Sequence, residues 1–183
     1  MPTAARVCTS DDGRPQGAAV RVLRKHRGRT LARVSSQPPL DLRGPLRTNT
    51  GHDLYYLRNS TAGVFGGDSY EVDVCAQFGA SVQITSSSAT KVYAMREAAS
   101  SRVHLEAGHR SRIFWGPHAT ILQQGSDFSQ ETTVVLNGGS LFLAEVVVFG
   151  RLSRGERHQF RRFGNWLKVV GASGARSMKR DTS

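Results

Sequence analysis

Three stretches of this sequence carry side chains that could bind a cation. Asp68 follows a glycine cluster, Thr85 and Ser86 open a hydroxyl-rich run that ends at Lys91, and Glu145 lies inside an otherwise apolar stretch. Carboxylate and hydroxyl oxygens are hard ligands, so four such groups could line a passage for a small hydrated cation. The sequence therefore offers Asp68, Thr85, Ser86 and Glu145 as a transient cation route.

Each of these groups also has a structural interpretation. Asp is a common turn former, and Asp68 could accept backbone N–H bonds as a cap. The hydroxyl run could be a solvated bend. A carboxylate surrounded by apolar residues must be paired, face water or be neutralised, and Arg151, Arg154 or Arg157 could pair with Glu145. The sequence favours the cap for Asp68 and an ion pair for Glu145.

No catalytic set is present in the sequence. No two histidines have the i, i+4 spacing of a helical zinc site, and no Gly-x-Ser-x-Gly or Walker A motif occurs. Solvent-exposed side chains are the simpler interpretation of all six histidines, which are His26, His52, His104, His109, His118 and His158. We therefore expect that the protein is not an enzyme.

The glycine cluster Gly63-Val64-Phe65-Gly66-Gly67-Asp68 resembles a phosphate-binding loop only superficially. A dinucleotide loop must lead into a helix, whose N–H groups face the phosphate. Here the alternating run Tyr70–Cys75 follows, and alternation is typical of a strand. The cluster is better interpreted as a tight crossing where only glycine fits against neighbouring backbone.

Alternating apolar and polar residues dominate the chain and predict strands with one face in water. Glycines punctuate the runs, and Gly79, Gly108 and Gly138 recur 29 and 30 residues apart. Each unit reads as strand, glycine turn, strand, kink, strand, and stacked units would bury a shared core. We predict an all-β protein of two stacked sheets built from glycine-hinged strand repeats. We expect at most one or two short helices, one of them near Met95–Ser100.

Charge is concentrated at the two ends of the sequence. The net charge is +11, but residues 48–150 hold six basic and nine acidic residues. Basic ends are commonly solvated, although they also raise the alternative of a basic, β-rich nucleic-acid-binding module. We expect a flexible basic segment over residues 1–16, a β domain over 17–160 and a basic, disordered tail over 161–183.

The location of the protein is predicted from what the sequence lacks. Cys8 and Cys75 are the only cysteines, which is too few for a disulfide framework. The first residues lack the apolar core of a signal peptide, and no run reaches membrane-spanning length. We expect a soluble cytoplasmic protein with no membrane partner.

Four stretches together resemble the urease accessory protein family UreD, also called UreH. They are Leu54–Asp68, Thr85–Tyr93, Pro117–Leu122 and, last, Glu145 with Phe149–Glu156. The motif positions carried by the resemblance are Gly63, Gly66, Gly67, Asp68, Lys91, Tyr93, Gly150, Arg151, Gly155 and Glu156. The similarity runs from about Gly17 to Phe160, so we expect a C-terminally truncated member.

The resemblance implies a function as well as a fold. It implies a scaffold that binds the urease apoprotein and a helical UreF-like protein, and through the latter a UreG-like GTPase. It also implies delivery of nickel to the urease metallocentre through a tunnel, with nickel held only transiently and no permanent cofactor. Under this resemblance Asp68, Thr85, Ser86 and Glu145 would contact the metal in passage.

Overall fold

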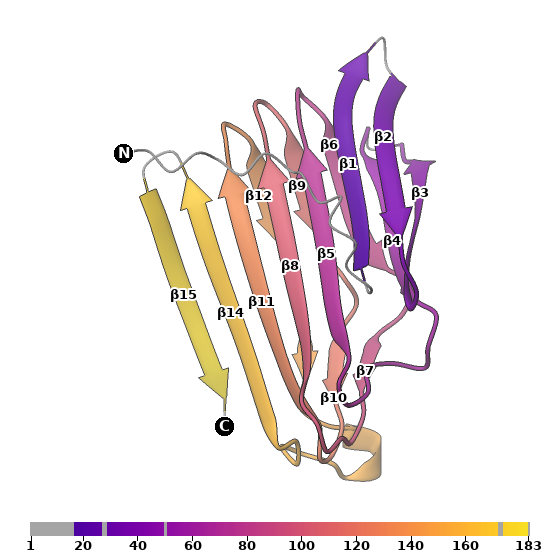
Figure 1. The fold of residues 1–183 in the computed structure, drawn as a ribbon, viewed down its shortest axis with the longest axis vertical. Helices are drawn as coiled ribbons and strands as arrows, with labels where there is room; N and C mark the ends of the chain where they lie inside the picture. Colours follow the sequence, from indigo (N-terminus) through magenta and orange to yellow (C-terminus); the bar gives the residue numbers. More distant parts are fainter. Residues whose placement is uncertain (1–16, 27–28, 50, 172–173, 183) are drawn as a thin grey trace.

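A computed structural model describes the backbone of residues 17–26, 29–49, 51–171 and 174–182, and the side chains of residues 32–49 and 51–171. The expected segment over residues 1–16 lies outside the described residues. The described chain is almost entirely β, as the alternating sequence predicts (Figure 1).

Two large sheets stack face to face, and a small third sheet closes one side between them. The seven-stranded sheet has the order β15-β14-β11-β8-β5-β1-β2, the five-stranded sheet β12-β9-β6-β4-β3, and the third sheet β13-β10-β7. In Figure 1, β12, β9 and β6 lie behind β11, β8 and β5. The prediction of two stacked sheets is confirmed, and the strand after each kink forms the third sheet.

The strand bounds follow the chain order. The first eight are β1 Gly17–His26, β2 Arg29–Ser36, β3 Leu40–Arg47, β4 Asp53–Asn59, β5 Ser69–Ala76, β6 Ser81–Ser86, β7 Thr90–Val92 and β8 Ala99–Ala107. The others are β9 Arg112–Trp115, β10 Thr120–Leu122, β11 Asp127–Leu136, β12 Ser140–Leu143, β13 Val147–Val148, β14 Arg162–Gly171 and β15 Gly174–Thr182. One 3-10 turn, η1, spans Leu152–Arg154.

The sequence repeat becomes a solenoid of parallel layers. One layer contains β5, β6 and β7, the next β8, β9 and β10, and the third β11, β12 and β13. Ser81 pairs with Arg112, and Arg112 pairs with Ser140, so equivalent strands stack in register. Among the strands that the structure describes, only β1 with β2, β3 with β4 and β14 with β15 pair antiparallel.

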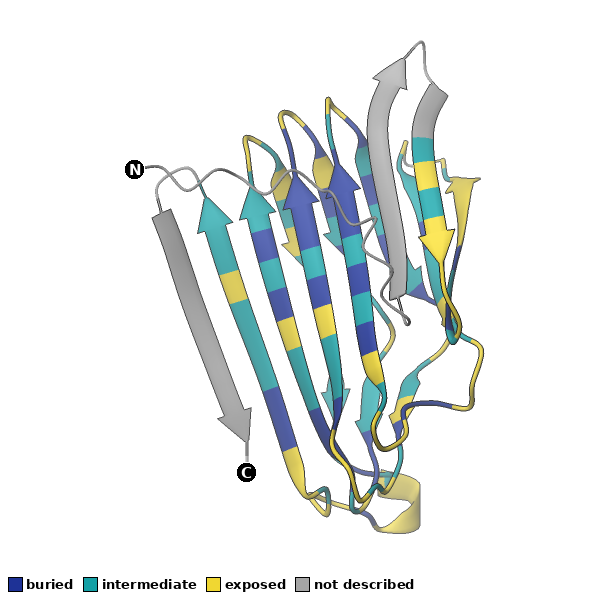
Figure 2. Ribbon diagram, in the orientation of Figure 1, coloured by how far each residue is buried: buried dark blue, intermediate teal, exposed yellow. Residues whose placement is uncertain are grey.

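The core lies between the two large sheets. Val74, Leu105 and Val134 from neighbouring layers are at most 1 % exposed, as are Ile84 and Ile113 from the facing sheet. Figure 2 shows buried positions alternating with less buried ones along β5, β8 and β11. Full burial of one such side chain contributes about 1.5–3 kcal/mol.

Two expectations about secondary structure are wrong. Residues 93–98 form a loop instead of a helix, and β8 begins at Ala99. The backbone of this loop is held from outside, because Met95 N–H donates to the Gly125 carbonyl and the Arg161 guanidinium donates to the Met95 carbonyl. These two hydrogen bonds to other segments take the place of the bonds that the Met95 backbone would make within a helix.

The second error concerns the expected disordered tail from residue 161. Arg162–Gly171 form β14, which pairs along its whole length with β11. Phe163 is 6 % exposed and its ring stacks near Phe128, at a centroid distance of 6.4 Å. In the sequence, the many basic residues around this strand made its apolar residues difficult to recognise as a strand pattern.

Candidate functional site

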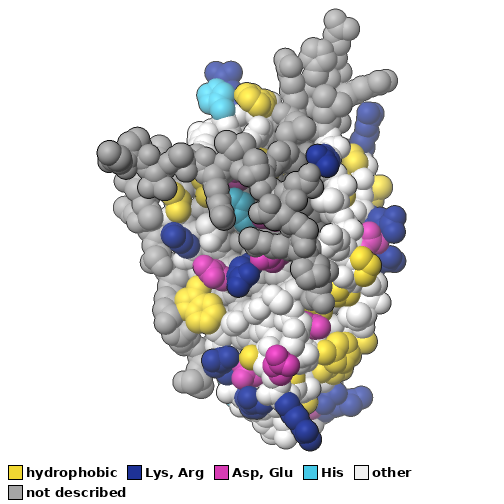
Figure 3. All heavy atoms as spheres, in the orientation of Figure 1, with side chains coloured by type: hydrophobic (Ala, Val, Ile, Leu, Met, Phe, Trp, Pro, Cys, Tyr) yellow, Lys and Arg dark blue, Asp and Glu magenta, His cyan; other side chains and the backbone are white. Residues whose placement is uncertain are grey.

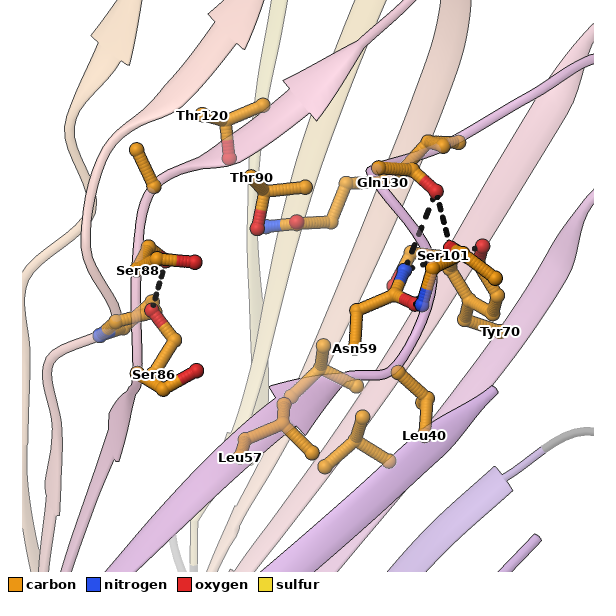
Figure 4. Close-up of a pocket in the computed structure, with 18 of the residues that line it drawn as sticks. Leu40, Leu57, Asn59, Tyr70, Ser86, Ser88, Thr90, Ser101, Thr120 and Gln130 are labelled. Atoms are coloured by element: carbon orange, nitrogen blue, oxygen red, sulfur yellow. Dashed lines mark hydrogen bonds between the residues drawn. The ribbon is translucent and has the colours of Figure 1, made fainter. Parts of the chain in front are cut away.

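A cavity of about 110 Å³ lies inside the solenoid, where the three sheets meet (Figure 4). Its walls come from β3 and β4, from the first strands of each layer, and from the loops that follow β4, β6 and β9. Its polar lining residues are Asn59, Thr61, Tyr70, Ser86, Ser87, Ser88, Thr90, Ser101, Thr120 and Gln130. The apolar part of the wall includes Leu40, Leu57, Val103, Trp115 and Phe128.

The chemistry of this wall is neutral. Among the side chains that the structure describes, no Asp, Glu, Lys, Arg or His lines the cavity. Hydroxyl and amide groups can donate and accept hydrogen bonds, and the volume is large enough for several water molecules. The cavity therefore suits water or a hydrated species more than a bare ion.

A second, smaller space of about 20 Å³ adjoins the first. The two share Pro117, Thr120 and Gln130 as lining residues, and the smaller one also contacts Glu145 and Asn165. Its volume corresponds to about one water molecule. The neutral cavity and the smaller space beside Glu145 therefore share part of one wall.

Glu145 is held by three neutral donors. Its Oε1 accepts from Trp115 Nε1 at 3.1 Å and from Gln130 Nε2 at 2.8 Å, and its Oε2 accepts from Asn165 Nδ2 at 3.4 Å. The expected ion pair with Arg151, Arg154 or Arg157 is not the arrangement found. The indole and amide donors carry no charge of their own and fix the orientation of the carboxyl group.

The two hydroxyls expected at the passage point in different directions. Ser86 lines the cavity, donates to the Ser88 carbonyl at 2.9 Å and accepts from the His118 N–H at 2.9 Å. Thr85 lies on the opposite side of β6, because Val82, Ile84 and Ser86 are the buried positions of that strand. Thr85 is not among the residues that line either space.

Asp68 is a turn cap, as the sequence favoured. Its Oδ2 accepts from the Phe65 N–H at 2.8 Å and from the Tyr70 hydroxyl at 2.6 Å. Burial, with the Asp68 carboxylate beside it, raises the pKa of Tyr70 to about 12. Tyr70 lines the cavity and accepts from Asn59 Nδ2 at 3.3 Å, so Asp68 touches the cavity wall through Tyr70.

The glycine cluster is the predicted tight crossing. A Cβ on Gly63 would lie 2.2 Å from the Lys91 carbonyl oxygen and 2.8 Å from the Tyr93 ring. Val64 forms a parallel bridge with Val92, and the Phe65 and Tyr93 rings stack at 5.0 Å. The structure thus brings the motif residues around Gly63 and Lys91 into contact.

The two other glycines of the cluster face a different loop. A Cβ on Gly66 would lie 3.1 Å from the Glu97 carbonyl oxygen. Gly67 has φ +80°, a conformation that glycine adopts without steric cost. The cluster therefore contacts both the strand β7 and the loop before β8.

The last group of motif residues closes the loop around η1. Gly150 has φ +112°, and a Cβ there would lie 2.4 Å from the Glu156 carbonyl oxygen. Gly155 ends η1 in the left-handed conformation. Arg151 binds Glu156 through two of its three guanidinium nitrogens, Nε and Nη2, and this hydrogen bonding lowers the pKa of Glu156 to about 2.

Residues that sequence reasoning missed complete the site. Trp115, Gln130 and Asn165 hold Glu145 from 30, 15 and 20 residues away in the chain. The 30-residue repeat was the available signal for Trp115, because it places β9 beside β12. Within the described residues, no group of three or more His, Cys, Asp or Glu side chains could hold a metal.

The surface of the seven-stranded sheet carries both signs of charge. Glu71, Arg102 and Glu131 are neighbours across β5, β8 and β11, and Arg102 lies 3.0 Å from Glu71. Figure 3 shows acidic and basic side chains interleaved over the described part of this face. In the part of the chain that the structure describes, no helix has the length and apolarity to cross a membrane.

Comparison with known proteins decides the family. A family model described as UreD urease accessory protein matches residues 16–177. The chain belongs to this family. The match to the UreD model passes Phe160, so the expectation that the resemblance ends there is wrong.

Individual UreD proteins are similar over part of their length. The chain is 36 % identical to "Urease accessory protein UreD 2" of Synechococcus sp. (strain JA-3-3Ab), covering 69 % of this chain and 47 % of the relative. It is 36 % identical to "Urease accessory protein UreD 2" of Streptomyces griseus, covering 80 % and 52 %. It is 32 % identical to UreD of Haemophilus influenzae (strain ATCC 51907), covering 61 % and 44 %. The chain spans about half the length of the curated relatives it matches.

Proposed function

We propose that this chain acts in urease maturation as a non-catalytic scaffold. The observation that carries the proposal is the UreD family match over residues 16–177. The proposed partners are the urease apoprotein and a helical UreF-like protein, which would bring a UreG-like GTPase. A solenoid of paired sheets supports such a role, because it offers extended rigid faces.

The proposed cargo is nickel, carried through the interior of the solenoid. Neutral hydroxyl and amide groups bind Ni²⁺ weakly, so a hydrated ion could pass without being trapped. Ser86 would contact the hydration shell in the larger space, and Glu145 would attract the cation in the smaller one. Asp68 would act only through Tyr70, and Thr85 has no place in this route.

Co-expression tests the scaffold role. The chain would be produced with a urease apoprotein and with UreF- and UreG-like proteins in a urease-negative host supplied with nickel. We expect the tagged chain to co-purify with the apoprotein and to raise the nickel content of purified urease. Equal nickel content without the chain, or failure to co-purify, would refute the role.

A substitution at Glu145 tests the route separately. Glu145→Gln keeps an oxygen acceptor for Trp115 and Gln130 but removes the charge. We expect unchanged co-purification and a lower nickel content. The matched control is Glu131→Gln, an exposed carboxylate on the outer side of β11. If both variants load urease equally, Glu145 has no part in transfer while the scaffold role stands.

A further inference from the structure

The outer face of the five-stranded sheet carries a row of apolar side chains. Val82 and Ile84 of β6 face the core, so the alternate residues of these strands face away from the seven-stranded sheet. Pairing aligns one outward residue from every strand, in the order Leu46, Leu54, Gln83, Phe114 and Phe142. We call Leu46, Leu54, Phe114 and Phe142 the apolar row.

The apolar row crosses the whole sheet, and the residues at its two ends are exposed to solvent. Leu46 is 53 % exposed and Phe142 is 61 % exposed. The Phe114 ring lies 6.4 Å from that of Phe142, and the His52 ring, beside the row, lies 4.4 Å from that of Phe114. Four strand spacings give a length of about 19 Å. Isolated exposed apolar residues are ordinary, whereas apolar side chains on four of five adjacent strands, interrupted only by Gln83 of β6, form an extended patch of the kind that marks a site of interaction.

Positive charge flanks the apolar row. The outward residues of these five strands include three arginines, Arg43, Arg58 and Arg112, and one carboxylate, Asp41. Asp41 lies 2.8 Å from Arg43 and 2.9 Å from Arg58, and those side chains remain 72 % and 52 % exposed. Arg112, next to Phe114 on the same side of β9, is also exposed. The face therefore favours a partner with negative charge.

The backbone of the sheet restricts the form of that partner. The interior strands β4, β6 and β9 are already paired on both sides, so a partner must bind this face through side chains. An α-helix satisfies its own backbone hydrogen bonds, and about 13 residues of helix span 19 Å. A second copy of this chain would place the same three arginines opposite one another.

We propose that this face binds an acidic amphipathic α-helix of a partner protein. The apolar row would contact the apolar stripe of the helix, and Arg43, Arg58 and Arg112 would contact its flanking carboxylates. This surface lies on the opposite side of the sheet from the cavity, and the proposal does not depend on the nickel route.

A model peptide tests the proposal on the full chain. The probe is a fluorescent helical peptide of about 18 residues, with leucines at i, i+3, i+4 and i+7 spacing and glutamates on both sides. We expect saturable binding that Phe142→Ser weakens about tenfold, because the change removes the most exposed apolar side chain of the row. The matched control is Phe78→Ser, because Phe78 is 65 % exposed but lies in the turn between β5 and β6. Thermal unfolding midpoints would show that both variants fold.

Charge reversal gives a second measurement. Arg112→Glu should weaken binding of the glutamate peptide. It should strengthen binding of a matched peptide that has lysines in place of the glutamates. Equal binding by the wild type, Phe142→Ser and Phe78→Ser would overturn the proposal. So would a dimer that Phe142→Ser abolishes, or tighter binding of a single-stranded RNA probe that the same variant abolishes.

Discussion

Arg151 and Glu156 face each other across the loop that contains η1, with Arg151 Nε 2.9 Å from Glu156 Oε2 and a second guanidinium nitrogen on Oε1. The Glu156 side chain is 9 % exposed. Gly150 and Gly155 allow the backbone to bring the two residues together, through positive φ angles of 112° and 75°. This bidentate pair, whose carboxylate is buried, closes the loop between β13 and β14.

The first prediction concerns the pH dependence of this pair. The pKa of Glu156 is lowered to about 2 by Arg151, so folding favours the ionised carboxylate. The pair's contribution to stability is therefore fully present above the ordinary Glu pKa of about 4.3 and is lost as pH falls towards 2. Urea unfolding should show that the wild type has a higher free energy of unfolding than Glu156→Gln at pH 7, and that this difference is smaller at pH 3. A difference that stays constant with pH would contradict the assignment.

The second prediction concerns the tight crossing at Gly63. Gly63→Ala places a Cβ against the Lys91 carbonyl oxygen and should destabilise the fold by about 1–3 kcal/mol. Gly116→Ala is the matched control, because no atom lies within 4 Å of its Cβ position. That change should be neutral or stabilise by up to about 1 kcal/mol. Equal unfolding free energies for the two variants would show that the crossing is looser than described.

The third prediction concerns the hydroxyl of Ser86. Ser86→Ala removes the acceptor for the His118 N–H and the donor to the Ser88 carbonyl. Leaving such groups without a partner should reduce the free energy of unfolding by about 1–3 kcal/mol. Ser87→Ala, at the exposed neighbouring position, should change it by less than about 0.5 kcal/mol. Chemical denaturation of both variants checks this, and a larger loss for Ser87→Ala would rule out the role given to Ser86.

The fourth prediction concerns thiol reactivity. Cys75 is 2 % exposed at the end of β5, so its thiol should resist labelling in the folded protein. The measurement uses a Cys8→Ser variant, which leaves Cys75 as the single thiol. We expect one reactive thiol in denaturant and almost none without it. Rapid labelling under native conditions would mean that β5 opens readily.

The layered fold was predictable because its signal is periodic. Gly79, Gly108 and Gly138 follow β5, β8 and β11, and their near-constant spacing matches the register of the stacked strands. The turn at Asp68 was predictable too, since a short carboxylate side chain after two glycines favours local hydrogen bonds. These features depend on neighbouring residues and on repetition.

The surroundings of Glu145 were not predictable in the same way. The sequence suggested the nearby arginines, but stacking brings Trp115, Gln130 and Asn165 to the carboxylate from three other segments. The start of β14 was hidden for a related reason. The loop with η1 lengthens the offset between paired residues, so that Asp127 pairs with Arg162, and the repeat of about 30 residues is lost at that point.

Parallel stacking also determines which parts of the molecule are destabilised by a change in one strand. Each layer contacts chiefly the layers directly before and after it, so the array behaves as a one-dimensional chain of nearest-neighbour couplings. A destabilising substitution in β9 weakens its own layer and the pairing of β9 with β6 and β12. The pairing of β3 with β4 is affected only indirectly, through the pairing of β9 with β6 and of β6 with β4. Opening should therefore begin at the terminal layers, and the layer of β8, β9 and β10 should be the last to exchange its amide hydrogens.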